Sequence, residues 1–365
     1  MTFINPGNER LKRRYVAYLE ELRGLSETSI EQALNSLKRF EQVTRATPFQ
    51  DIGPAHAREF RKRLLQQGSS AAHESSIRLS ANAVLTNLRQ FFIWLKAQPG
   101  LRQTMKGFDP DYFSLSLEDA RIARTRFERP SHSIDELRRV VLAMPSGSEV
   151  QKRNRAMMAL LLLTGTRVTA LASLKLKHVR RDGLGIDQDA REVKTKFRKS
   201  FPTFYFPVGD DIKAIFVDYV TFLRSDLGFH LDDPLFPSTR QGVRAHTIEV
   251  LGLTREHWKT ADTVWDVFKR AFAALGLPCY GPHSVRRTLA LLGQETCTTP
   301  ASFKAWSQNL GHEGVLTTFA SYGTLPATKQ AELLRASTRG EAPQELTANE
   351  RQRLKQLLAG LSDPN

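Results

Sequence analysis

The first hundred residues carry a hydrophobic pattern that predicts a bundle of helices. In residues 10–98, apolar positions recur every three or four residues over four segments, which is the spacing of the buried face of a helix. Thr28 and Glu31 have the spacing of a capping box and predict that the second helix starts there. Residues 1–98 are therefore expected to form an all-α domain. Three aromatic residues of its last helix are expected in the core rather than stacked on bases, namely Phe91, Phe92 and Trp94.

The pattern fades after this bundle and then resumes. Over residues 99–132 the periodicity is lost and Gly, Pro and charged residues gather, which predicts a linker. Ser133 and Glu136 then form a capping box ahead of a new apolar stripe, so we place the second domain at residues 133–339. Residues 340–365 are expected to be a tail with an amphipathic helix, whose apolar side would pack on its own domain or on a neighbouring subunit.

The second domain mixes helices with short strands. A strongly apolar helix over residues 153–163 is expected to end at Gly165, because glycine permits a tight helix exit. An alternating segment follows, in which Lys194 and Lys196 would share one face of a strand. The expected strands cover residues 184–186, 191–197 and 201–208, with a turn at 198–200. Later helices are expected at residues 211–227, 261–275 and 285–293, with a polar loop at 235–244. The predicted fold class is mainly α with a small antiparallel β-sheet: an all-α bundle followed by an α+β domain.

Composition and charge narrow the choice of partner. The chain has 365 residues and a formal net charge of +15, which favours a polyanionic partner but says nothing of the fold. Its two cysteines, Cys279 and Cys297, belong to no CxxC motif and no His/Cys cluster, so neither a disulfide framework nor a zinc site is indicated. No apolar run is long enough to span a bilayer, and the first residues lack the apolar segment of a secretory leader. We therefore expect a soluble cytoplasmic protein.

Basic side chains lie on the faces that the apolar stripes of the bundle leave over. Residues 1–110 hold 17 Lys and Arg against 10 Asp and Glu. Each of them taken alone is most simply a solvated surface residue, but as a group they are expected to contact phosphates. The residues singled out for this role are Arg39, Arg58, Arg61, Lys62, Arg63, Arg78 and Arg89.

The residues with the most distinctive chemistry lie between positions 282 and 322. His283 and Arg286 are three residues apart and so share one face of a helix. A Leu-Gly-His triplet that ends at His312 follows, then two threonines, and then Tyr322. A His and an Arg on one helix face are more often simply solvated. In this order, however, the residues supply cationic groups, proton carriers and a hydroxyl nucleophile, which phosphoryl transfer to tyrosine requires.

This order resembles the carboxy-terminal signature of the tyrosine recombinases, the phage-integrase family, which reads His-x-x-Arg, Leu-Gly-His, Thr-Thr and a nucleophilic tyrosine. The segment 163–167, Leu-Thr-Gly-Thr-Arg, resembles the first arginine box of that family. Residues 193–197, Val-Lys-Thr-Lys-Phe, resemble the hairpin that brings in a catalytic lysine. The resemblance covers about residues 10–325. It implies that the amino-terminal bundle is a core-binding domain and that the second domain is the catalytic domain.

The resemblance also implies which residues bind the phosphate. Arg167 and Arg286 would clamp its non-bridging oxygens with charge-assisted hydrogen bonds, helped by His312. The family pattern has an acidic residue three positions after the first arginine, where this chain has Ala170. Such an acid orients the neighbouring cations, so its replacement bears on the rigidity of the site more than on its chemistry.

The remaining candidates would attack phosphorus and move protons. Tyr322 would be the nucleophile, although it lies ten positions after His312, one more than the commonest family spacing. His283 would accept the proton of Tyr322 or stabilise the transition state. Lys196 would protonate the departing 5′-oxygen, with Lys194 as the alternative. The sequence shows no Asp/Glu metal cluster and no P-loop, so no cofactor and no metal are expected.

The hypothesis that follows is a site-specific DNA recombinase or integrase of a mobile element. Its expected partner is double-stranded DNA in the nucleoid, bound by a homotetramer on paired sites, while the charge of +15 suits a monomer in free solution. Two other hypotheses stay open. A type IB topoisomerase-like enzyme would share the tyrosine chemistry but relax DNA as a monomer, and an inactive descendant of a recombinase would bind DNA as an architectural protein.

Overall fold

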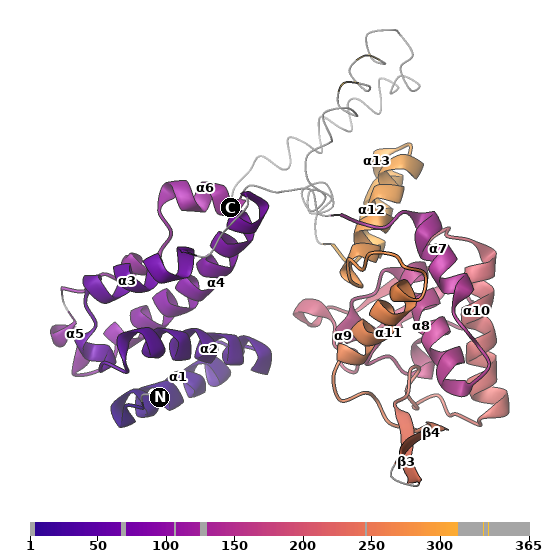
Figure 1. Cartoon of the computed structure of the whole chain (residues 1–365), viewed down its shortest axis with the longest axis horizontal. Helices are drawn as coiled ribbons and strands as arrows, with labels where there is room; N and C mark the ends of the chain where they lie inside the picture. Colours follow the sequence, from indigo (N-terminus) through magenta and orange to yellow (C-terminus); the bar gives the residue numbers. More distant parts are fainter. Residues whose placement is uncertain are drawn as a thin grey trace. The chain divides into compact units, whose positions relative to one another are not determined.

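The chain forms two compact units, residues 1–127 and residues 128–365. The computed structural model describes residues 4–66, 71–105, 107–124, 130–244 and 247–312, together with residues 331 and 335. Both units are built mainly of helices, and the second also contains two small antiparallel sheets (Figure 1). The predicted fold class is confirmed.

The amino-terminal unit is a helical bundle arranged around one long helix, α4, against which α2, α3 and α6 pack. Its helices are α1 (Pro6–Glu21), α2 (Glu27–Thr44), α3 (Pro54–Leu65), α4 (Ala71–Lys96), α5 (Leu101–Thr104) and α6 (Leu117–Arg124), with 3₁₀ turns η1 (Phe49–Asp51) and η2 (Pro110–Phe113). The second helix begins at Ser26, whose hydroxyl accepts a hydrogen bond from the Ser29 amide, so the capping box predicted at Thr28 and Glu31 is wrong by two residues.

Aromatic rings fill the core of this bundle. Phe91 and Phe92 are fully buried and Trp94 nearly so, which confirms their prediction as core residues. The rings of Phe40 and Phe60 meet edge to face, with their centroids 5.1 Å apart. Such edge-to-face pairs favour one relative orientation, so they fix the helix packing more specifically than aliphatic contacts would.

The segment expected as a linker contributes to this core as well. Phe108 and Phe113 are buried among the bundle aromatics, and the rings of Phe92 and Phe113 stack with their centroids 4.8 Å apart. The short helices α5 and α6 and the turn η2 carry this segment across α4. The sequence pattern misses this packing because the helices are too short to show a periodic stripe.

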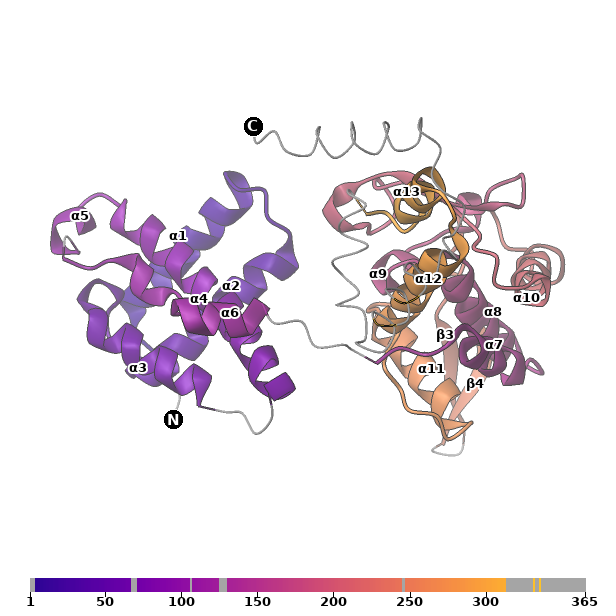
Figure 2. The same cartoon turned by 90° about the horizontal axis from the view of Figure 1, so that it is seen from above.

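The carboxy-terminal unit surrounds α8, which is buried from Ala156 to Thr164. A helix that is apolar on every side lies inside a domain, and here α7, α10 and α12 pack around it (Figures 1 and 2). The helices of this unit are α7 (Ile134–Ala143), α8 (Glu149–Thr164), α9 (Val168–Leu171), α10 (Asp210–Thr221), α11 (Asp262–Ala273), α12 (His283–Thr296) and α13 (Pro300–Asn309), with the shorter turns η3 (Leu176–His178), η4 (Lys196–Arg198) and η5 (Phe222–Asp226). The capping box of Ser133 and Glu136 is present at the start of α7.

The first sheet differs from its prediction. Strand β1 (Gly185–Gln188) pairs with β2 (Phe201–Phe204), so the lysine-bearing segment expected as a strand at residues 191–197 is instead a long loop. The Asp189 carbonyl accepts hydrogen bonds from the amides of Glu192 and Val193, which turns the chain away from the sheet. Lys194 and Lys196 therefore do not share the face of a strand.

A second hairpin stands where a polar loop was expected. Strands β3 (Thr239–Arg244) and β4 (Thr247–Leu253) pair with a bulge after Arg240, and the hairpin projects from the helices of the unit (Figure 1). Buried Arg153 of α8 holds its base by donating to the Pro237 carbonyl at 2.7 Å and to the Thr239 hydroxyl at 3.0 Å. Burial lowers the pKa of Arg153 to about 10.

Candidate functional site

The first arginine of the candidate site, Arg167, lies just after the end of the buried helix α8. Gly165 caps α8 in the left-handed conformation, with φ of 58°, and Arg167 follows as the residue ahead of α9. The hydroxyls of Thr164 and Thr166 lie 2.8 Å apart and are buried, which fixes the turn between them. A rigid turn on a buried helix therefore presents the half-buried Arg167 side chain.

The second arginine joins three segments of the site. Arg286 of α12 is 4% exposed and donates to the backbone carbonyl of Gly165 and, at 2.5 Å, to that of Leu310. Its Nη2 also lies 3.3 Å from His312 Nε2. Because a guanidinium can only donate, the imidazole accepts at Nε2 and keeps its proton at Nδ1. Arg286 thus ties the arginine box to the Leu-Gly-His triplet.

Positive charges surround His312. Burial and the positive charge of Arg286 lower the pKa of His312 to about 4, with smaller contributions from Arg167, His283 and Lys196. All four of these groups are cations or proton carriers: Arg167 precedes α9, His283 and Arg286 lie on α12, and Lys196 lies on the β1–β2 loop. The structure therefore places four of the predicted catalytic residues near the imidazole of a fifth, His312.

Two of these residues face solvent. His283 is the first residue of α12 and its side chain is exposed. Lys196 is exposed at the tip of the β1–β2 loop, and its Nζ lies 4.8 Å from the centre of the Phe197 ring. Lys194, the alternative acid, has its backbone fixed instead: its amide donates to Ser173 Oγ at 2.9 Å. Lys196 is among the positive charges that lower the pKa of His312.

The position of the acidic residue in the family pattern lies in the core. Ala170 is 1% exposed among the apolar residues around α8, where an ionised carboxylate would be costly unless paired. The described hydrogen bonds of Arg286 end at two carbonyls and an imidazole instead. Two backbone carbonyls thus help to orient Arg286.

One positioning residue escaped the sequence pattern. The side-chain amide of Asn309 accepts from the Phe204 amide at 2.7 Å and donates to the Phe204 carbonyl at 2.9 Å. It thus continues the edge of β2 and holds α13 beside the sheet. Gly311 explains the middle residue of the triplet, because with φ of 69° a Cβ there would lie 2.6 Å from the Phe201 ring. The sequence signal that could have indicated this role is the polar Asn309 directly before the Leu-Gly-His triplet.

The predicted nucleophile lies outside the described residues. Tyr322 and the two threonines before it follow His312, the last residue described in this region. The helix predicted in the tail at 340–365 also lies outside them.

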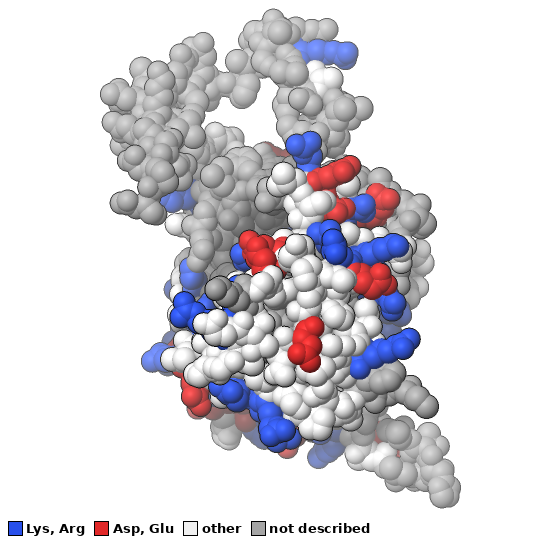
Figure 3. Space-filling view, turned by 90° about the vertical axis from the view of Figure 1, so that its left-hand side faces the viewer, with Lys and Arg blue, Asp and Glu red and all other residues white. Residues whose placement is uncertain are grey.

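The basic residues predicted to bind DNA fall into two groups. Four of them are held within the amino-terminal unit: Arg78 by Asp119 at 2.8 Å, Arg89 by Asp111 at 2.6 Å, Arg63 by Glu59 at 2.7 Å and Arg61 by the Ser114 carbonyl at 3.2 Å. Within the described residues, Arg39, Arg58 and Lys62 are exposed without a hydrogen bond or ion pair. Figure 3, which looks onto this unit, shows Lys and Arg interspersed with Asp and Glu rather than one continuous basic patch.

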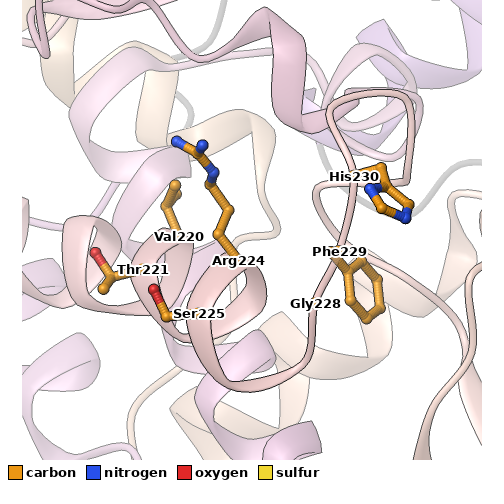
Figure 4. Close-up of a pocket in the computed structure, with 7 residues that line it drawn as sticks. All are labelled: Val220, Thr221, Arg224, Ser225, Gly228, Phe229 and His230. Carbon is orange, nitrogen blue, oxygen red and sulfur yellow. The ribbon is translucent and has the colours of Figure 1, made fainter.

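A hollow of about 550 Å³ lies elsewhere, at the end of α10 and along the turn η5. Figure 4 shows Arg224 projecting from that turn, and His230 on the loop that follows. It contains none of the predicted catalytic residues.

Among the described residues no group of three His, Cys, Asp or Glu could hold a metal ion. In the same part of the chain, no helix combines the length and apolar character needed to cross a membrane.

Comparison with known proteins gives one family model, which matches part of the chain, and one fold. Residues 13–99 match the family model described as phage integrase, N-terminal SAM-like domain. No curated protein sequence matches the chain. The fold is similar to a lambda integrase dimer bound to a COC′ core site, with a TM-score of 0.57, 18% identity, and coverage of 93% of this chain and 99% of that one.

Two further solved structures have the same fold. A lambda integrase tetramer bound to a Holliday junction gives a TM-score of 0.56 with 19% identity, covering 87% of this chain and 77% of that one. The Tn1549 transposon integrase in complex with a circular intermediate DNA gives 0.54 with 14% identity, covering 89% and 98%. The fold of this chain is therefore similar to that of these integrases. The matched family model covers the amino-terminal unit, and the solved structures show that the chain as a whole has the fold of these integrases.

Proposed function

We propose that the protein is a site-specific DNA recombinase that cleaves and rejoins DNA through a 3′-phosphotyrosine intermediate, in the service of a mobile element. The observation that carries this proposal is the group of cations and proton carriers around His312, set in the tyrosine-recombinase fold. Cations crowded together repel one another, so such a group is stabilised by an anion that binds among them. A DNA phosphate supplies that anion.

The first step would join tyrosine to phosphorus. The Tyr322 oxygen attacks the scissile phosphate while its proton passes to His283. Negative charge grows on the two non-bridging oxygens, where the guanidinium groups of Arg167 and Arg286 stabilise it. Because His312 Nε2 accepts from Arg286, its Nδ1–H is the group left to donate to a phosphate oxygen.

The second half of the step releases a DNA strand. As the bond between phosphorus and the 5′-oxygen breaks, its electron pair goes to that oxygen and Lys196 protonates it. The 3′-phosphotyrosine keeps the energy of the phosphodiester, so a 5′-hydroxyl from a second DNA can reverse the step and join the strands. The exchange is therefore balanced without a nucleotide cofactor.

The same reasoning supports an assembly of four subunits. Each chain supplies one Tyr322, and exchange between two duplexes cuts four strands, so four protomers complete one reaction. Lambda integrase, which shares the fold, has been captured as a dimer on a core site and as a tetramer on a Holliday junction. The similarity to a transposon integrase bound to a circular intermediate supports the role in a mobile element.

A covalent adduct tests the function directly. The full chain is incubated with duplexes from the DNA beside its own gene, each nicked near a candidate site so that the cleaved end diffuses away. We expect a protein–DNA band that survives denaturing electrophoresis, and we expect Tyr322→Phe to bind the same DNA but give no band, because only the hydroxyl is removed.

The same assay separates the other hypotheses. An architectural protein would bind the DNA, but neither the wild-type protein nor Tyr322→Phe would form an adduct. That result would refute the proposal. A topoisomerase-like enzyme would form the adduct but also relax supercoiled plasmid as a monomer, so relaxation without a paired-site complex would favour it. Adducts from Tyr322→Phe would show that another residue is the nucleophile.

A further inference from the structure

The loop that carries the site lysine is fixed at its base. The Glu192 carboxylate pairs with Lys177 at 2.8 Å and with Lys175 at 3.4 Å, both on the neighbouring segment around η3. Two residues further on, the Lys194 amide donates to Ser173 Oγ and the Lys194 carbonyl accepts from Thr169 Oγ1 at 3.3 Å. These contacts anchor the loop up to Lys194 and leave its tip to project from a fixed support.

The tip itself has an unusual backbone. Phe197 and Arg198 both have positive φ, 60° and 51°, a region that side chains other than glycine rarely adopt. The Phe197 ring is 71% exposed, although an aromatic ring of this size is usually buried. Just before them, the Thr195 hydroxyl is buried without a hydrogen-bond partner in the described structure. The loop thus holds a large apolar ring in solvent at a conformational cost.

The exposed ring contacts the ammonium group of Lys196. The distance of 4.8 Å from Nζ to the ring centroid is within the range of a cation–π interaction. Within the described structure the Lys196 ammonium makes no hydrogen bond or ion pair, whereas Lys175 and Lys177 on the adjacent segment are paired with carboxylates. A carboxylate would hold the protons of a lysine in hydrogen bonds. A ring face attracts the charge but leaves the N–H groups able to donate elsewhere.

We propose that Phe197 is the positioning residue for Lys196: its ring confines the protonated ammonium so that an N–H reaches the departing 5′-oxygen. The inference rests on the proposed function, in which the proton of Lys196 Nζ moves to that oxygen while its bond to phosphorus breaks. A lysine side chain alone has many rotamers, and the ring restricts them without competing for the proton. Phe197 acts through Lys196 and touches no reacting atom.

A change of leaving group tests this role. Substrates carry either oxygen or sulfur at the 5′-bridging position of the scissile phosphate, and a thiolate leaves without being protonated. Single-turnover cleavage is measured at saturating protein, so that DNA affinity does not enter. With the oxygen substrate, Phe197→Leu should slow cleavage about fivefold, the upper end for one exposed cation–π contact. With the sulfur substrate it should cleave within about twofold of the wild-type chain, because no proton is then needed.

Three further variants isolate the ring. Phe197→Trp retains a π face and should restore cleavage of the oxygen substrate. Phe197→Gly removes the ring but suits the positive φ, so it should be as slow as Phe197→Leu if the ring, and not the backbone, matters. Phe204→Leu is the matched control, because it removes another exposed ring of the same hairpin. The centre of that ring lies 5.2 Å from Arg180 Cζ. This variant should leave cleavage of the oxygen substrate and of the sulfur substrate unchanged.

The outcomes separate this inference from the function on which it rests. Sulfur rescue of Lys196→Ala without rescue of Phe197→Leu would overturn the role of Phe197 and leave the acid in place. Wild-type cleavage of the oxygen substrate by Phe197→Leu or Phe197→Gly would overturn it too. If sulfur fails to rescue Lys196→Ala, then Lys196 is not the acid, and both the mechanism and the positioning role are refuted.

Discussion

The two units use their basic side chains in different ways. In the amino-terminal unit, several arginines are bound by the unit's own carboxylates, as Arg78 is by Asp119 at 2.8 Å. Around His312 in the carboxy-terminal unit, the four charged groups that act on the imidazole are all cations or proton carriers. Paired charges stabilise the fold, although each surface pair adds only modestly to the free energy of unfolding. A crowd of like charges opposes the fold and is expected only where an anion is bound.

The comparison also predicts which arginines matter for cleavage. Arg167→Ala should slow formation of the covalent adduct by about a hundredfold or more at saturating DNA, because it removes a charge contact made to the transition state. Arg78→Ala is the matched control, since the pairing of Arg78 with Asp119 keeps its charge within the fold. Adduct kinetics on a nicked duplex measure both. Equal rates for Arg167→Ala and the wild-type chain would remove Arg167 from the site.

The rigidity of the arginine turn is predicted to depend on Gly165. An alanine there would adopt a φ of 58° and bring its Cβ within 2.9 Å of Leu289 Cδ1. We expect a loss of about 2–3 kcal/mol in the free energy of unfolding, of which the left-handed backbone accounts for about 1–2. Urea denaturation measures the change.

Gly183→Ala is the control for the backbone part of that loss. Gly183 has a φ of 67° but nothing within 4 Å of the added Cβ, so only the backbone term of about 1–2 kcal/mol applies. Equal losses in the two variants would mean that contact with α12 does not constrain the turn. Cleavage should fall in Gly165→Ala alone, because the Gly165 carbonyl is an acceptor for Arg286.

Much of this fold could be predicted from the sequence because its helices are long and periodic. Four helices of the bundle, the start of α7 at Ser133 and the glycine cap of α8 follow from spacing and capping residues alone. The β1–β2 loop could not be predicted in this way. Its apolar and polar residues alternate like those of a strand, but only Val193 is buried, and the loop is set by hydrogen bonds to Asp189 and by the ion pairs of Glu192.

The site shows the same division. The sequence motifs alone predict that residues far apart in the chain, such as Arg167 and His312, belong to one site. It could not show that carbonyls orient Arg286, since every residue has a carbonyl and the sequence carries no mark of which ones converge. Nor could it show that Arg78 and Arg89 are paired, because their partners Asp119 and Asp111 lie 41 and 22 residues away.

DNA affinity should depend on the unpaired basic residues of the amino-terminal unit. Arg58 and Lys62 lie four residues apart on α3, hence on one face. Removing either should weaken binding at low salt and reduce the slope of log K against log salt by about 0.9, the contribution of one phosphate contact. Fluorescence anisotropy at several salt concentrations measures this slope. Arg78→Ala should change it little, and a change as large as that of Arg58→Ala would mean that the ion pair opens on DNA.

The smallest expected effect concerns the protonation of His312. Its pKa of about 4 results first from burial and then from the nearby cations. NMR titration of the free protein should therefore show a neutral His312 imidazole from pH 8 down to about pH 5, well below the ordinary histidine pKa of about 6.5. Arg167→Gln should raise that pKa only in part, because burial remains. A titration near pH 6.5 would mean that the cations do not converge on this imidazole.

The depressed pKa also fixes the sign of a stability change. Between pH 6.5 and about 4 the unfolded chain binds a proton at this histidine and the folded chain does not, so His312 favours unfolding increasingly as the pH falls through that window. Above pH 6.5 the protonation of His312 no longer lowers the free energy of unfolding. His132 and His178, whose pKa values burial also lowers, add losses of the same sign. His312→Gln should remove part of this acid sensitivity in urea titrations at pH 5 and pH 7.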